Sequence, residues 1–377
     1  MKLRFPLLLL GLVACEVEPI EADDPIAGLD PDPDPEPEPE PDPEPSEIQT
    51  LTVDATDREA FVYVDLDTAT VLDASAADGT DWDLAIRRFE IRTNGGTSGA
   101  GTVASGLAYD PPGLYDADDE PILAEFQALD ADNTVDWLTG EIDDEEMAAD
   151  SVPGVFSEDW FDYDFMTGIA TANPDVGWVI RGAEGTSYAR VRMTDLDFPT
   201  REGMGIKSFT VTVEVEDTDG FAAPITFEGS VPGEGGAVCF DMDTDTNVAC
   251  TEASWDLQLG FSGRSTFLYT NSGAAGDGMG GALGPYDWTE LSGWTSASTN
   301  PGGQDLSNFF ESDVSESALS IDSWFAYNLQ GQFQLYPTFR VYAVSPSEDG
   351  PLWALQVTDY YNDDQVGGHV TLRWVER

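Results

Sequence analysis

The segment Trp82–Ile86 (WDLAI) recurs later in the chain as Trp255–Leu259 (WDLQL). In both places alternating apolar residues follow. A glycine-rich turn then comes after them, TNGGTSGAG at residues 93–101 and TNSGAAGDG at residues 270–278. Matching landmarks in the same order indicate that one structural unit is present twice.

The repeat continues beyond the glycine-rich turns. WFDY at residues 160–163 is matched by WFAY at residues 324–327. The repeating unit is about 165 residues long, which is too long for a solenoid repeat and is typical of a domain. We therefore predict two similar domains, the first at residues 49–215 and the second at residues 216–377.

Most of each unit has the pattern of β-strands. Residues 209–215 (FTVTVEV) and residues 369–375 (HVTLRWV) alternate large and polar side chains and are rich in β-branched residues. This alternation is typical of half-buried strands. One short helix is indicated at residues 121–129. The sequence therefore predicts an all-β fold of mainly antiparallel strands, arranged as a sandwich or a curled sheet.

Residues 1–15 have the pattern of a bacterial lipoprotein export signal. Lys2 and Arg4 precede the apolar run LLLLGLVA at residues 7–14, and Cys15 follows that run. The run is too short to remain as a membrane-spanning helix. We therefore expect lipidation at Cys15, which would anchor the protein to the outer membrane at the cell surface. An ordinary cleaved signal is the alternative.

An acidic and proline-rich segment follows at residues 16–48, with the alternation DPDPDPEPEPEPDPEP at residues 30–45. Closely spaced prolines and like charges prevent packing, so we predict a disordered tether. The net charge of the whole chain is −58. This charge argues against nucleic acid and anionic lipid head groups as partners. Adaptation to salty surroundings and a surface that holds divalent cations are two explanations for it.

Cys239 and Cys250 are the two cysteines beyond Cys15, and an exported protein can keep such a pair oxidised. They flank a polar turn between two short strand-like stretches, which predicts a hairpin closed by a Cys239–Cys250 disulfide. The same turn carries alternate oxygen-bearing side chains, namely Asp241, Asp243, Asp245 and Asn247. The spacing resembles a calcium loop, which is an alternative role, although the central glycine and the distal acid of such loops are missing.

Residues that serve common catalytic reactions are scarce. The single histidine, His369, lies in a predicted strand, so neither a Ser-His-Asp site nor a usual zinc centre is indicated. The glycine-rich turn at residues 93–101 lacks the lysine and the strand-to-helix setting of a phosphate-binding loop, and a tight connection between strands explains it better. Acidic residues are too numerous to single out a glycosidase pair, and that class stays open. We predict a protein that is not an enzyme.

The lipoprotein start, the segment at residues 82–101 and the closing strands together resemble the HmuY family of secreted haem-binding lipoproteins. Residues 82–101 (WDLAIRRFEIRTNGGTSGAG) are the most specific part, and their second copy is similar. The resemblance implies an all-β fold in two tandem copies. It also implies that the protein captures haem outside the cell and passes it to an outer-membrane haem transporter. A haemless surface binding or structural module with the same fold is the alternative.

The resemblance further implies that two side chains hold the haem iron, typically histidines and in some members methionine. A pair of histidines is impossible here, which leaves Met147 and Met166 of the first copy as candidates, because a thioether sulfur can ligate haem iron. Core packing is the alternative for Met166, and Tyr163 is a further candidate ligand. Residues 285–340 of the second copy contain neither methionine nor histidine. The acidic chain also offers few cationic partners to the haem propionates.

Overall fold

The structure is a computed structural model that describes residues 47–142, 146–157, 159–200, 204–262, 265–347 and 350–377. Cys15, the export signal and residues 16–46 of the predicted tether lie outside the described residues. Among the described residues, no helix is both long and apolar enough to cross a membrane. The paired strands are antiparallel, for example β1 with β23 and β10 with β11, which confirms the predicted all-β fold.

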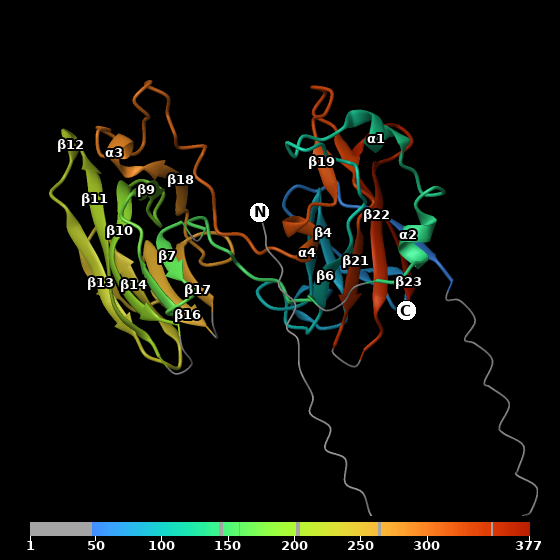
Figure 1. Ribbon diagram of the computed structural model, residues 1–377, viewed down its shortest axis with the longest axis horizontal. Helices are drawn as coiled ribbons and strands as arrows, with labels where there is room; N and C mark the ends of the chain where they lie inside the picture. Colours follow the sequence, from blue (N-terminus) through green and yellow to red (C-terminus); the bar gives the residue numbers. More distant parts are fainter. Residues whose placement is uncertain (1–46, 143–145, 158, 201–203, 263–264, 348–349) are drawn as a thin grey trace, which may run out of the picture. The chain divides into compact units, whose positions relative to one another are not determined.

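Residues 47–150 and 314–377 form hydrophobic cores together, and we call them the discontinuous lobe. Its main sheet has the strand order β1-β23-β22-β21-β6, so strands from the two ends of the described chain lie side by side. Figure 1 shows this as the teal strand β6 beside the red strand β21. A four-stranded sheet, β3-β2-β4-β5, and the β19–β20 hairpin complete the lobe.

The strands of this lobe are β1 (Gln49–Asp54), β2 (Val62–Asp65), β3 (Thr70–Leu72), β4 (Leu84–Arg87), β5 (Glu90–Thr93), β6 (Ala104–Tyr109), β19 (Phe325–Tyr327), β20 (Leu335–Pro337), β21 (Val341–Ser345), β22 (Trp353–Tyr361) and β23 (Gly367–Glu376). Its helices are η1 (Ala74–Asp78), α1 (Leu123–Ala128), α2 (Val135–Thr139) and α4 (Ala318–Ile321). Helix α1 lies within the predicted helix, and β23 contains the predicted closing strand.

Residues 151–313 form a second set of cores and are called the continuous lobe. Its main sheet contains the run β13-β11-β10-β9-β18 and is extended by β12 and by the β7–β8 hairpin. A four-stranded sheet, β15-β14-β16-β17, packs with it around one core.

The strands of the continuous lobe are β7 (Phe161–Asp164), β8 (Ile169–Ala172), β9 (Val176–Arg181), β10 (Tyr188–Pro199), β11 (Ile206–Asp217), β12 (Gly220–Phe221), β13 (Ile225–Val231), β14 (Gly236–Asp241), β15 (Thr246–Val248), β16 (Leu257–Ser262), β17 (Ser265–Thr270) and β18 (Gly281–Asp287). Its helix is α3 (Trp288–Leu291). Strand β11 contains the predicted strand at residues 209–215.

The two main sheets have the same plan. In each, one edge strand precedes a four-stranded sheet in sequence and the other follows it, as β1 and β6 do for β2–β5 and as β13 and β18 do for β14–β17. Between these edges lie three consecutive strands from elsewhere in the chain, β21–β23 in one lobe and β9–β11 in the other. Both lobes thus have the same strand order, although different parts of the chain supply it.

The predicted boundary between residues 49–215 and 216–377 falls near the end of β11, and neither core follows it. Strand β11 pairs with β13 across that boundary, and β1 pairs with β23 from the far end of the chain. Each lobe therefore combines the first half of one predicted copy with the second half of the other. The repeat in the sequence identifies equivalent halves, and strand pairing joins halves from different copies in each lobe.

The chain passes between the lobes twice, after Asp150 and after Asp313. The two crossover segments run antiparallel to each other. The backbone N–H of Ser151 donates to the carbonyl oxygen of Glu316 at 3.1 Å, and the N–H of Glu316 donates to the carbonyl oxygen of Ser151 at 2.8 Å. Both crossings consequently occur at one hydrogen-bonded place.

Candidate functional site

The candidate haem ligand Met166 lies at the tip of the β7–β8 hairpin. Its side chain is 79% exposed, and that of the adjacent Phe165 is 80% exposed. The alternative that Met166 packs in the core is therefore wrong. The Asp164 carboxylate fixes the turn, because it accepts hydrogen bonds from the N–H of Met166 at 2.9 Å and from the hydroxyl of Thr167 at 2.8 Å.

Tyr163 lies in β7 just before this tip and is also exposed. Alternation along the strand places Tyr163 on the opposite face from Asp162 and Asp164. The hairpin tip thus combines a thioether, a phenol and a phenyl ring. Thioether and phenolate groups can ligate haem iron, so this donor set fits one axial position. The two carboxylates oppose an approach of haem propionates from their own face.

The other candidate ligand, Met147, belongs to the discontinuous lobe. It precedes Ala148, which exchanges two backbone hydrogen bonds of 2.9 Å with Ser105 of β6. Its half-buried side chain lies against Gly106, where an added Cβ would come within 3.2 Å of the Met147 Cγ. In the part of the chain that the structure describes, Met147 and Met166 belong to different lobes and make no contact. The structure does not bring them together as two ligands of one iron.

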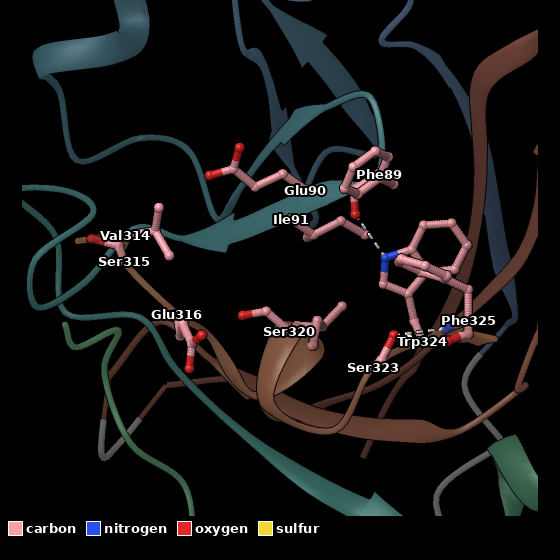
Figure 2. A pocket seen from close by; sticks show the side chains of 11 residues that line it. Phe89, Glu90, Ile91, Val314, Ser315, Glu316, Ser320, Ser323, Trp324 and Phe325 are labelled. Carbon is pink, nitrogen blue, oxygen red and sulfur yellow. Dashed lines mark hydrogen bonds between the residues drawn. The ribbon is translucent and has the colours of Figure 1, made fainter. Parts of the chain in front are cut away.

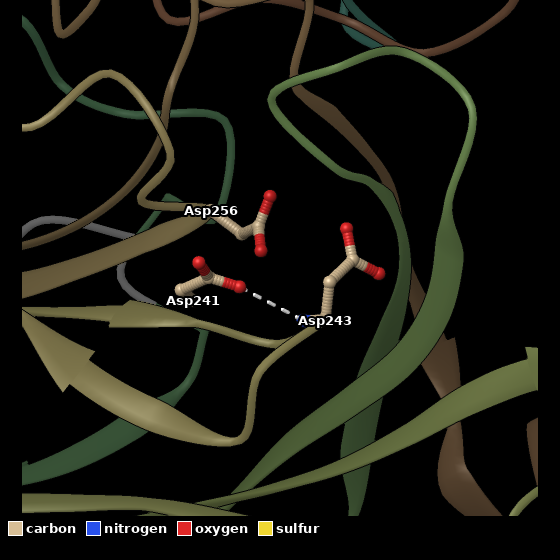
Figure 3. A group of neighbouring side chains, drawn as sticks. All are labelled: Asp241, Asp243 and Asp256. Carbon is tan, nitrogen blue, oxygen red and sulfur yellow. Dashed lines mark hydrogen bonds between the residues drawn. The ribbon is translucent and has the colours of Figure 1, made fainter.

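Three carboxylates meet at the Cys239–Cys250 hairpin, from Asp241, Asp243 and Asp256 (Figure 3), with oxygen atoms within 4.8 Å of one another. Both oxygens of Asp256 accept backbone N–H groups, from Ala183 at 2.7 Å and from Met242 at 2.8 Å.

Asp241 accepts the N–H groups of Asp243 and Thr244, each at 3.0 Å. Burial raises the pKa of Asp256 to about 6. The cluster is explained by the hydrogen bonds that shape the hairpin, and Asp245 and Asn247 of the calcium-like series are not part of it.

The discontinuous lobe has the counterpart of this buried acid. Asp83 accepts the N–H of Leu66 at 2.8 Å, and burial raises the pKa of its carboxyl to about 6. The Trp-Asp pairs that define the repeat thus supply one buried carboxylate to each lobe. Each of them binds the turn of the preceding hairpin.

The Cys239–Cys250 disulfide is present and joins the end of that hairpin, with the two Cα atoms 5.2 Å apart. Cys239 lies in β14, opposite Val248 of β15. The predicted strand, polar turn and return strand are all observed.

The glycine-rich turn at residues 93–101 is a tight structural connection, as predicted. The Asn94 side chain donates to the carbonyl oxygen of Trp82 at 2.8 Å and accepts the N–H of Gly101 at 2.9 Å. Gly96 has a positive φ of 59°, and an added Cβ would lie 1.9 Å from the carbonyl oxygen of Asp150. Only glycine allows the chain leaving the lobe to pass this close.

Two buried aspartates hold the crossover segments to these turns. Asp150 accepts the N–H of Thr93 at 3.0 Å and its hydroxyl at 2.5 Å. Asp313 accepts the N–H of Thr270 at 2.8 Å and its hydroxyl at 2.7 Å, and also the N–H of Val155 at 2.8 Å. Burial raises the pKa of both carboxyls. Sequence reasoning missed both residues, because nothing close to either in sequence marks its partner.

Residues 57–209 match the HmuY protein family. The HmuY match includes the β7–β8 hairpin with Met166 and crosses from the discontinuous into the continuous lobe. The resemblance seen at residues 82–101 is thereby confirmed for the first copy. No curated protein matches the chain.

Solved structures similar to this chain include three from bacteria of the genera Bacteroides and Tannerella. One is described as an HmuY-like heme binding protein from Bacteroides vulgatus ATCC 8482, with 11% identity, coverage of 88% of this chain and 92% of that chain, and a TM-score of 0.29. A lipoprotein from Bacteroides fragilis NCTC 9343 has 12% identity, coverage of 88% and 91%, and a TM-score of 0.30. An apo HmuY analog from Tannerella forsythia has 14% identity, coverage of 89% and 98%, and a TM-score of 0.26.

Proposed function

We propose that this protein is an exported, lipid-anchored haem-binding protein of the HmuY type that captures haem at the cell surface for iron acquisition. The observation that carries the proposal is the family match at residues 57–209, within which the β7–β8 hairpin exposes Met166, Phe165 and Tyr163. Haem would supply iron as the cargo. Met166 or Tyr163 would ligate that iron, and Phe165 would cover part of the porphyrin face.

Anchoring through Cys15 and delivery to an outer-membrane haem transporter belong to the same proposal. They are supported by the export-signal pattern of residues 1–15 and by the long acidic segment that follows it. A role in binding rather than in catalysis is also part of the proposal. Among the described residues, the buried carboxylates of Asp83 and Asp256 accept backbone N–H groups and are not held free in a cleft.

A haemless surface binding or structural module is the second candidate function. Two observations favour it. Met147 and Met166 lie in different lobes, so the expected pair of sulfur ligands is not assembled. Asp162 and Asp164 flank the exposed hairpin tip and would repel the two haem propionates.

Haemin titration of the whole protein, followed by absorbance, distinguishes these functions. We expect a shifted Soret band that is lost in Met166→Ala, because little affinity for haem remains once this single exposed thioether is removed. Met147→Ala should keep the band. Met279→Ala is the matched control, since Met279 is 59% exposed in the same lobe as Met166 and lies outside the matched residues.

Each other outcome has a definite meaning. An unchanged band in Met166→Ala would reject this ligand, and loss of the band in Tyr163→Phe would then assign the phenol instead. A spectrum equal to that of free haemin with the natural protein would overturn haem capture and support the haemless module.

A further inference from the structure

The discontinuous lobe contains a pocket that shares no residue with the β7–β8 hairpin. It is an apolar pocket of about 250 Å³ in the discontinuous lobe, bordered by the β4–β5 turn, by the crossover segment after Asp313 and by α4. Figure 2 shows side chains from these three segments around one space. The residues that line it are Phe89, Glu90, Ile91, Val314, Ser315, Glu316, Leu319, Ser320, Ser323, Trp324 and Phe325.

Three aromatic and three aliphatic side chains line the pocket, and several of them are held in place by the core. Ile91, Leu319 and Trp324 are each at most 2% exposed. Phe325 packs edge-to-face on Trp324, with ring centroids 4.8 Å apart, and on Phe89 at 5.7 Å. Such a pocket is formed before any ligand enters it, and preformed apolar walls of this kind are typical of small-molecule sites.

The polar groups that line the pocket are mostly engaged with the protein itself. The Trp324 indole N–H donates to the carbonyl oxygen of Phe89 at 3.0 Å, and the Ser320 hydroxyl donates to that of Ser317 at 2.9 Å. The hydroxyl of Ser315 bonds that of Thr97 at 2.8 Å. The pocket therefore demands few hydrogen bonds from an occupant, which favours an apolar molecule.

Carboxylates give the pocket a negative character. Glu90 is paired with Arg87 and Arg92, whereas the half-buried Glu316 carboxylate has no hydrogen-bond or ion-pair partner among the described residues. Burial raises the pKa of Glu316. A negatively charged ligand would meet this carboxylate in a partly dehydrated place, so anions are disfavoured.

The position that matches Arg92 is a tyrosine in the continuous lobe. Counting back from the matched threonines Thr93 and Thr270, Tyr269 stands where the discontinuous lobe has Arg92. The Tyr269 hydroxyl donates to the carbonyl oxygen of Val152 in the other crossover segment at 2.8 Å, so its ring covers that segment. Arg92 instead turns away, toward Glu90 and over the Phe61 ring. The matched positions thus have different partners in the two lobes.

We infer that the pocket lined by Ile91, Val314 and Trp324 binds a neutral, mainly aromatic small molecule of about the size of two fused rings. A cavity of about 150 Å³ accommodates benzene, so the observed volume suits a somewhat larger ring system and is too small for a whole haem. The ligand class follows from the aromatic walls, the satisfied polar groups and the negative character of the rim. This site is independent of the haem proposal.

The test uses two dyes with the same ring skeleton and different charge. N-phenyl-1-naphthylamine is neutral, and 1-anilinonaphthalene-8-sulfonate carries a sulfonate. With the whole protein, we expect saturable one-to-one fluorescence enhancement by the neutral dye and much weaker binding of the sulfonate. Glu316→Gln should strengthen binding of the sulfonate several-fold while leaving the affinity for the neutral dye within about twofold.

Val314→Trp should fill the mouth of the pocket and weaken binding of the neutral dye about tenfold or more. Val366→Trp is the control, because Val366 is equally exposed, at 48% against 46% for Val314, and lies in the β22–β23 turn of the same lobe. Thermal unfolding checks that both variants fold. Equal binding by Val314→Trp and the natural protein, or equal loss in both variants, would overturn the site.

Discussion

The continuous and discontinuous lobes have the same strand order, yet the chain supplies them differently. Residues 151–313 build the continuous lobe without help from the rest, whereas the other lobe needs both residues 47–150 and residues 314–377. The comparison shows that each of the two equivalent cores combines residues from both predicted copies, and that neither copy forms a core from its own residues alone. We therefore expect stability and binding to differ between the two lobes and not between the two predicted copies.

The largest effect is expected from cutting the chain in two ways. Residues 151–313 expressed alone should fold, because β7–β18 and their core all lie within them. Residues 216–377 should remain largely unfolded, because β23 then lacks β1 and β13 lacks β11. Circular dichroism and urea denaturation of both fragments measure whether each one is folded and unfolds cooperatively.

A cooperative unfolding transition in residues 216–377 would show that the second predicted copy can close a core of its own. The predicted sequence boundary would then describe a folding unit, and the lobes would be an alternative pairing of the same strands.

A smaller effect should separate the two crossover aspartates. In Asp313→Ala, the N–H and the hydroxyl of Thr270 and the N–H of Val155 lose their acceptor. The free energy of unfolding should fall by roughly 3 kcal/mol or more. Asp150→Ala removes two hydrogen bonds to Thr93 and should cost roughly 2 kcal/mol. Urea denaturation measures both. An Asp150→Ala variant that is the less stable of the two would contradict the hydrogen-bond count.

The smallest expected effect concerns the pH dependence of the two Trp-Asp carboxyls. Burial raises the pKa of Asp83 to about 6 from a usual value of 3.8. The folded state therefore holds this proton more tightly than the unfolded state, and the contribution to stability falls as pH rises from about 4 to 6. Asp83→Asn should remove this loss, so its stability relative to the natural protein should rise by on the order of 1 to 2 kcal/mol between pH 4 and pH 7.

Asp256→Asn is the matched variant in the continuous lobe. Both Asp256 oxygens accept backbone N–H groups, so the new amide faces a donor and loses one hydrogen bond. Its stability relative to the natural protein should rise with pH in the same way, but it should be less stable than Asp83→Asn at every pH. Unfolding curves at several pH values measure this, and identical stabilities of the two variants would remove the proposed difference between the lobes.

Local features of the fold could be predicted well from the sequence. The Cys239–Cys250 hairpin, the helix near residue 123 and the glycine-rich turn after Asn94 all depend on residues close together in the chain. Less of the candidate site could be predicted. Met166 was recognised as a candidate ligand, but its exposure at a hairpin tip depends on Asp164 and on the register of β7 with β8.

Residue patterns along the chain are enough to predict that it is β-rich and that its two hairpin cysteines pair, and they indicate one structural unit present twice. Each of these follows from alternation, matching motifs or short-range closure. Which halves share a core depends on tertiary contacts, because both copies offer equivalent strand edges and a local pattern cannot choose between them.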